Sequence, residues 1–280
     1  MLRKGDLTQG GITGTLLHFT LPMLVGSFLQ QCYNIADTLI VGQCIGAGAL
    51  AAVGSAYTLM VFLISVLLGL AMGSGTVFSL HYGAGNHVAL RRSIFSSFVL
   101  IGIVTLILNV AVFIWLDPIL RLLQVPQDIY GMMRSYLWII FCGIVFTFIY
   151  NFYASLLRAV GDSVTPLWFL AVSVVLNIAL DLFFILQLDW GIQGAAAATV
   201  LAQGVAALGI IIYTYRRRPE LRWHHEDMCF DRTLLEGNSF LLYTDLRPTV
   251  GDESGNPDGT GACQQLWNSG NGSFCGSCED

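Results

Sequence analysis

Polar and ionisable side chains interrupt some of the most apolar stretches of this 280-residue chain. The stretch 21–42, LPMLVGSFLQQCYNIADTLIVG, is long and apolar enough to cross a bilayer, yet it carries Gln30, Asn34 and Asp37. At about 100° per residue, these three side chains fall within a narrow arc of one helix face. A carboxylate in a lipid-crossing helix costs roughly 2.5–3.5 kcal/mol, so we expect it to face a cavity in the protein. The alternative is that Asp37 lies at the helix end among the lipid headgroups.

A second carboxylate, Asp181, lies in a later apolar stretch. Asn177 precedes it by one helical turn on the same face, and Thr199 follows a run of alanines in the next stretch. A tight outer turn between the two stretches would put Asp181 and Thr199 at a similar depth, about 10 Å from that turn. The two positions are therefore expected to meet.

Two carboxylates, an amide and a hydroxyl are hard oxygen donors, which suit a small hard cation or proton exchange. We therefore predict a cation or proton site made of Asp37, Asn177, Asp181 and Thr199, which could hold Na⁺. The alternative is that Asn177, Asp181 and Thr199 only join helices by hydrogen bonds.

The composition is that of a polytopic membrane protein. Hydrophobic residues make up 55% of the chain and charged residues only 11%, with a mean hydropathy of +0.68. A soluble domain carries about 25% charged residues. We expect an all-α protein in contact with membrane lipid, without a cleavable signal peptide and without a nucleic-acid partner. The cysteines of the apolar runs are expected to be buried hydrophobic residues rather than disulfide partners: Cys32, Cys44 and Cys142.

Six apolar runs are each near the length that a helix needs to cross the hydrocarbon layer. They form a predicted bundle over 14–218, preceded by a short amino-terminal segment, 1–13, and followed by a linker, 219–236. The runs are 14–41, 50–80, 93–115, 136–157, 167–188 and 192–215.

Basic residues predict the orientation of this bundle. Most of them lie at the amino terminus, in the loops after the second and fourth runs, and after the sixth run, whereas the opposite loops hold only Arg121 and Arg134. Both ends of the bundle are therefore expected in the cytoplasm, with the protein in the cell membrane.

Several separated stretches resemble the multidrug and toxic compound extrusion (MATE) transporters, in order and spacing. They are PMLVGSFLQQCYNIADTLIVG, HYGAGNHVALRRS, ASLLRAVGDSVTP, NIALDLFFI and GIQGAAAATV, within a similarity that covers roughly 11–218. The resemblance implies an exporter of organic cations and amphipathic drugs, driven by Na⁺ or H⁺ and without a cofactor. It places Asp37, Asn177, Asp181 and Thr199 on the family's cation or proton site, with Gln30 and Asn34 lining the adjoining substrate cavity.

The sequence departs from the family pattern in having one six-helix bundle where members have two. Since alternating access rocks one bundle against the other, complete transport is expected to need a second bundle or a homodimer. A lipid-linked oligosaccharide flippase of the same broad group is an alternative, although its cavity would be expected to be more basic. A remnant that inserts without transporting is another.

The segment 237–280 is rich in Gly, Asn, Ser and Asp, and is expected to be a disordered polar tail. Read one base later with freely chosen codons, much of it can yield a string that resembles the family's seventh span. We therefore expect a frameshifted or truncated gene product.

An intramembrane enzyme is the competing class. Ser74 and His81 are the nearest nucleophile and base, but a G-x-S-G pattern is missing and His81 falls at the membrane edge. We therefore expect no enzymatic activity.

Overall fold

The computed structural model describes residues 12–122 and 125–222. The chain divides into two units, Met1–Asp245 and Leu246–Asp280, and all the described residues belong to the first. The predicted tail over 237–280, nearly all of the amino-terminal segment and most of the linker lie outside the described residues.

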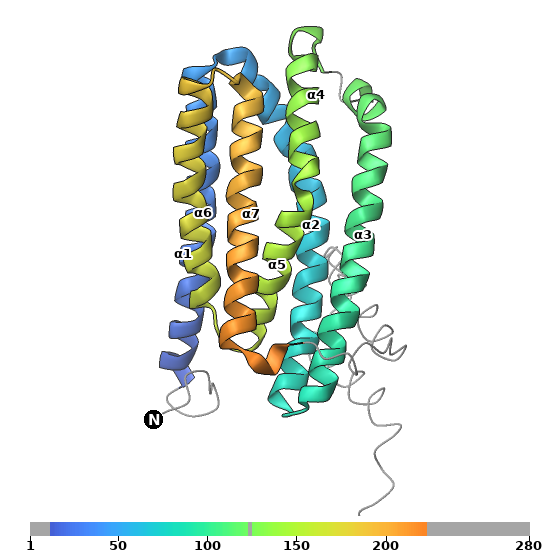
Figure 1. The fold of residues 1–280 in the computed structure, drawn as a ribbon, viewed down its shortest axis with the longest axis vertical. Coiled ribbons are helices and arrows are strands. Elements are labelled where there is room, and N and C mark those ends of the chain that lie inside the picture. Colours follow the sequence, from blue (N-terminus) through green and yellow to red (C-terminus); the bar gives the residue numbers. More distant parts are fainter. Residues whose placement is uncertain (1–11, 123–124, 223–280) are drawn as a thin grey trace, which may run out of the picture. The chain divides into compact units, whose positions relative to one another are not determined.

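The described part of the chain is built from helices. Consecutive long helices run antiparallel, joined by short turns (Figure 1). They are α1 (Ile12–Cys44), α2 (Ala47–Gly83), α3 (His87–Leu122), α4 (Gln127–Cys142), α5 (Ile144–Ala159), α6 (Val164–Leu182), the π-helix η1 (Phe183–Gln187), α7 (Gly191–Arg217) and the 3₁₀ turn η2 (Pro219–Leu221).

Four helices, α2, α3, α6 with η1, and α7, are each long and apolar enough to cross a membrane. The pair α4 and α5 passes the same test together, although it bends by 47°. The predicted fourth span, 136–157, is therefore a broken helix. With its 33 residues, α1 also exceeds the length of a membrane span, but it is not among the helices that are apolar enough to pass this test.

The surface of the bundle is apolar, as a lipid-facing surface requires. Large hydrophobic side chains are exposed along α1, α2, α3 and α6, among them Phe28 (71%), Phe62 (66%), Ile114 (68%) and Val175 (70%). Such extensive exposed apolar area marks a membrane-contacting surface rather than a water-facing one. Together with the spanning helices, it makes this a multi-pass membrane protein.

The helices α6 and α7 position the centre of the bundle. Helix α7 packs against α6, α5, α4 and α1, while α1 lies along α6 and α2. Many buried residues of α7 are glycines and alanines, which let neighbouring backbones come close. Side-chain hydrogen bonds to backbone carbonyls add ties between helices, as from Ser155 Oγ to the Ala71 oxygen (2.7 Å) and from Tyr150 Oη to the Pro166 oxygen (3.1 Å).

The bend between α4 and α5 lies at Gly143. A Cβ atom added there would stand 2.4 Å from Cγ2 of Val200 on α7. The bent α4–α5 segment therefore crosses α7 at a point where only a glycine fits. Next to the break, the side chain of Asn109 on α3 donates a hydrogen bond from Nδ2 to the backbone carbonyl oxygen of Phe141 at 2.7 Å. Close packing against α7 and this polar tie to α3 hold the kink in place.

The cysteine prediction is half wrong. Cys32, Cys44 and Cys142 are free thiols, as expected, but all three are exposed on the bundle surface rather than buried. Sequence alone could not distinguish the face that meets another helix from the face that meets lipid, because both are apolar.

We predict that Gly143→Ala lowers the stability of the bundle by about 1–3 kcal/mol, because overpacking forces the α4–α7 contact apart. Thermal unfolding of the detergent-solubilised protein measures this loss. Gly131→Ala, within α4, is the matched control, since a Cβ there meets nothing within 4 Å. Adding Val200→Ala should restore much of the loss, and a double variant no more stable than Gly143→Ala would contradict the proposed contact.

Candidate functional site

Two carboxyl groups from distant parts of the chain meet inside the bundle. Asp37 of α1 is 8% exposed and Asp181 of α6 is fully buried. Their side chains lie within range of a direct interaction, because α1 packs along α6. We call these two residues the buried acid pair.

A hydroxyl of α7 links the helices that carry the acid pair. Thr199 Oγ1 accepts a hydrogen bond from Tyr33 Oη of α1 (3.3 Å) and another from Asn177 Nδ2 of α6 (3.4 Å). Asn177 is fully buried, one helical turn before Asp181. The structure therefore brings together all four residues that the sequence placed at a cation or proton site.

The unusual property of this cluster is an excess of hydrogen-bond acceptors. Asp37 Oδ1, Asn177 Oδ1 and both carboxyl oxygens of Asp181 are buried and have no hydrogen-bond partner in the described part of the chain. A buried acceptor without a partner costs roughly 1–3 kcal/mol, and more when it is charged. Like charges also repel: at an effective dielectric constant of about 20, two unit charges that approach to about 4 Å do so by roughly 4 kcal/mol. A proton or a small cation would relieve both costs.

A tight turn between η1 and α7 sets Asp181 opposite Thr199. Asp189 and Gly191 adopt positive φ angles of 53° and 54°, and the Trp190 amide donates to the Phe184 carbonyl oxygen at 3.1 Å. The rings of Phe184 and Trp190 stack with their centroids 5.2 Å apart. A Cβ atom at Gly194 would lie 3.1 Å from Cβ of Phe184, so this glycine keeps α7 close to the preceding helix.

Two tyrosines that the sequence analysis missed complete the cluster. Tyr33 hydrogen-bonds Thr199, and Tyr136, a buried residue of α4, lies within electrostatic range of both Asp37 and Asp181. Tyr33 could have been found, since it lies one turn before Asp37 on the same helix face. Tyr136 carries no such signal, because it begins an apolar run with no polar residue one turn away.

The predicted substrate residues lie on the same helix as Tyr33 and Asp37. Gln30 and Asn34 are half-buried on α1, and Asn34 Nδ2 donates to Gln31 Oε1 at 3.1 Å. Their assignment to a substrate cavity stays a prediction. Of the enzyme candidates, Ser74 donates to the Leu70 carbonyl oxygen at 3.0 Å in its own helix.

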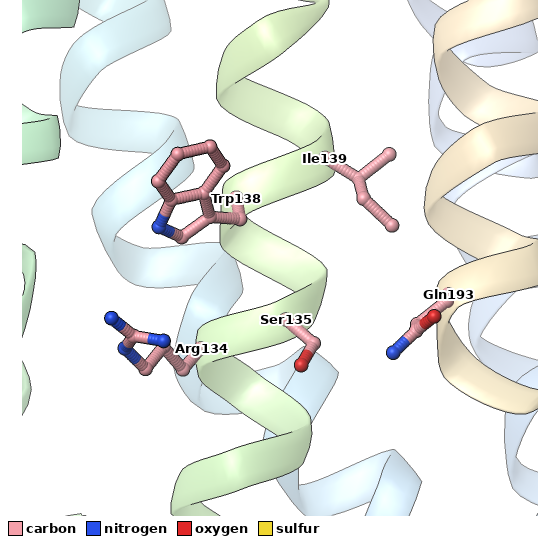
Figure 2. A pocket seen from close by; sticks show the side chains of 5 residues that line it. All are labelled: Arg134, Ser135, Trp138, Ile139 and Gln193. Atoms are coloured by element: carbon pink, nitrogen blue, oxygen red, sulfur yellow. The ribbon is translucent and has the colours of Figure 1, made fainter.

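A surface pocket of about 320 Å³ lies between α4 and α7 near the end opposite the chain's amino terminus. Figure 2 shows Ile139 and Gln193 facing each other across the gap, with Arg134 and Trp138 on the other side of α4. The pocket includes none of the residues of the buried acid cluster. Arg134 is already paired with Asp117, Nε to Oδ1 at 2.9 Å.

Known sequences resemble a large part of this chain. The profile of the MatE family matches residues 22–183. The probable multidrug resistance protein YpnP of Bacillus subtilis (strain 168) is 36% identical over 217 residues, which is 78% of this chain and 49% of that protein. The multidrug export protein MepA of Staphylococcus saprophyticus is 31% identical over 210 residues, or 72% of this chain and 45% of that protein. The chain thus spans about half the length of these curated relatives.

Solved structures share the fold. A crystal structure of MATE in the bent conformation superposes with a TM-score of 0.81 at 23% identity, covering 88% of this chain and 55% of that one. An outward-facing multidrug resistance MATE family transporter of the MOP superfamily gives a TM-score of 0.80, also at 23% identity, with the same coverage. Both share the bundle with this chain.

We predict that Tyr33→Phe destabilises the bundle by about 1 kcal/mol, since it removes the hydrogen bond to Thr199 and nothing else. Tyr57→Phe is the matched control, because Tyr57 is 47% exposed on α2. Thermal unfolding of both variants in one detergent measures the difference. Equal stabilities for the two variants would show that the Tyr33 hydroxyl does not hold α1 to α7.

Proposed function

Because the chain belongs to the MatE family, we propose that it is the amino-terminal bundle of a cation-coupled secondary transporter. In this proposal, entry of Na⁺ or H⁺ drives export of small organic cations and amphipathic drugs. The names of the relatives, a probable multidrug resistance protein and a multidrug export protein, support the substrate class. Acidic side chains in the bundle interior fit a positively charged substrate.

The observation that carries the proposal is the buried acid pair with its unpartnered oxygens. If Asp37 and Asp181 served only to hold the fold, we would expect hydrogen-bond donors beside their oxygens. Asp117 and Asp162 have such donors, in Arg134 and Thr165. Two acids that are kept together without donors are stable only when a positive charge is bound. Binding and release of that charge is what a coupling site requires.

The chemistry of the donors favours an alkali cation or a proton. Carboxylate, amide and hydroxyl oxygens are hard ligands, which Na⁺ and H⁺ accept and soft metals do not favour. Within residues 12–122 and 125–222, no group of three or more His, Cys, Asp and Glu residues is placed to hold a metal ion. Asp37, Asp181, Asn177 and Thr199 would hold the coupling ion, with Tyr33 orienting Thr199.

Transport itself needs more than this bundle. Alternating access moves two bundles around a shared site, and this chain spans about half of its relatives. We propose that it acts together with a second bundle. A bundle that inserts without transporting is the competing reading, and the flippase reading is disfavoured by the acidic interior.

The charge distribution supports an orientation with both ends of the bundle in the cytoplasm. Seven of the nine described arginines lie at the end where α2 meets α3 and α7 ends, and only Arg121 and Arg134 lie at the opposite end. Arginine and lysine are enriched on the cytoplasmic side of membrane proteins.

We predict that the coupling ion stabilises the protein through the acid pair. At about 100 times its Kd, a bound ion adds roughly 2.7 kcal/mol. Thermal unfolding is measured in NaCl and in choline chloride of equal ionic strength, each at acidic and alkaline pH. Asp37→Asn and Asp181→Asn should each abolish the response to Na⁺ or to acid.

The matched control is Asp189→Asn, since Asp189 lies in the outer turn and Asn tolerates its positive φ. This variant should respond as the unaltered protein does. Ethidium efflux by cells that express the chain alone or with a second bundle then tests transport. Efflux that persists in both acid variants would rule out the coupling mechanism, whereas ion binding without efflux in either setting would favour the non-transporting bundle.

A further inference from the structure

Positive charge gathers at one end of the described bundle. We call its seven arginines the basic rim: Arg91, Arg92, Arg158, Arg216, Arg217, Arg218 and Arg222. Only two carboxylates accompany them there, Asp162 and Glu220, whereas at the opposite end two arginines face three aspartates. The rim therefore carries a net positive charge at the level where the spanning helices leave the membrane.

The segment after α7 helps to assemble this rim. After Arg217 the chain turns through η2, which packs against α3 as well as α7 (Figure 1). Leu221 anchors the turn because its side chain is buried, and Arg222 Nε donates to the Tyr215 carbonyl oxygen at 2.6 Å. This crossing brings η2 from the end of α7 to the side of the bundle where α3 begins.

The rim's carboxylates are already engaged. Asp162 accepts hydrogen bonds from the amide and hydroxyl of Thr165 and lies 3.6 Å from Arg218. Glu220 lies 3.5 Å from the same arginine. Both carboxylates therefore pair with Arg218, and neither compensates the positive charge of another rim arginine.

Three arginines of the rim have no hydrogen-bond or ion-pair partner in the part of the chain that the structure describes: Arg92, Arg216 and Arg217. Arg216 and Arg217 are exposed, while Nε of Arg92 is buried and unpartnered. A buried guanidinium N–H without an acceptor is costly, so Arg92 in particular calls for an oxygen ligand.

An exposed apolar side chain lies one helical turn from one of these arginines. Ile212 is 51% exposed and precedes Arg216 by four residues on α7, on its membrane side, because α7 ends at the rim. Residues four apart share a helix face, so Arg216 lies at the end of an exposed apolar surface. An anionic head with an apolar tail matches this arrangement, whereas a free anion would use only the arginine.

We propose that the basic rim binds the phosphate headgroup of an anionic phospholipid, with Arg92, Arg216 and Arg217 as the principal donors and the lipid's acyl chains beside Ile212. Guanidinium groups suit phosphate because they offer paired N–H donors in a planar fork. Basic pockets between membrane helices are known sites for such headgroups.

The test measures retention of dioleoyl phosphatidylglycerol by the purified full chain, with dioleoyl phosphatidylcholine as the neutral comparison, by native mass spectrometry across a lipid titration. Each arginine near the surface contributes about fivefold in affinity. The double variant Arg92→Gln with Arg216→Gln should therefore weaken phosphatidylglycerol binding by about 25-fold. The double variant Arg121→Gln with Arg134→Gln, at the opposite end, should leave binding unchanged.

A variant with Arg92→Lys and Arg216→Lys keeps the charge and guards against a loss that reflects misfolding. It should recover most of the binding. Equal retention of the two lipids by the unaltered protein, or an equal loss in the control double variant, would overturn the proposal. So would full competition by glycerol 3-phosphate at the same concentration, which would identify a site for soluble phosphate. Binding that emerges only after Glu226→Gln with Asp227→Asn would also overturn it, because the chain's own acids would then be the rim's partner.

Discussion

The arrangement of this bundle depends on the burial of two carboxyl groups, three of whose oxygens have no hydrogen-bond partner among the described residues. Asp37 and Asp181 lie on helices more than a hundred residues apart in sequence, in an interior whose other buried residues are mostly apolar. Their burial is unfavourable without a bound positive charge, so the surrounding packing must hold them in place. The protein thus keeps a local free-energy cost at its centre, and under the proposed function a bound cation or proton would lower it.

The packing that holds the acid pair relies on small residues. Alanines and glycines along α7 let α6 and α4 approach. The missing side chain of Gly143 leaves room for Val200, the neighbour of Thr199 in the sequence. The bend between α4 and α5 and the tight turn at Asp189 and Gly191 are backbone features that set side chains at the right depth. Here, steric fit positions the polar groups, since few hydrogen bonds join the helices around the pair.

Much of this could be predicted from the sequence. Apolar run lengths identified the spans, and the polar stripes that include Asp37 and Asp181 identified the faces that meet, because a charged group in lipid admits few environments. The bend at Gly143 could not be predicted, since a glycine in an apolar run is equally compatible with a straight helix. Tyr136 was missed for a related reason, because an aromatic residue in a membrane helix is ordinarily read as apolar. Exposed cysteines were misjudged because apolar periodicity does not separate lipid contact from helix contact.

The π-helical segment Phe183–Gln187 begins two residues after Asp181. A π turn accommodates one more residue than an α turn, so it offsets the angular register of the residues on its two sides by about 100°. The outer turn therefore leaves η1 in a direction that differs, relative to the Asp181 side chain, from the one that a continuous α-helix would give. Deleting a single residue from the segment would rewind it as α-helix and rotate one side relative to the other, so this short stretch acts as the angular adjustment between the acid pair and the turn that leads to Thr199.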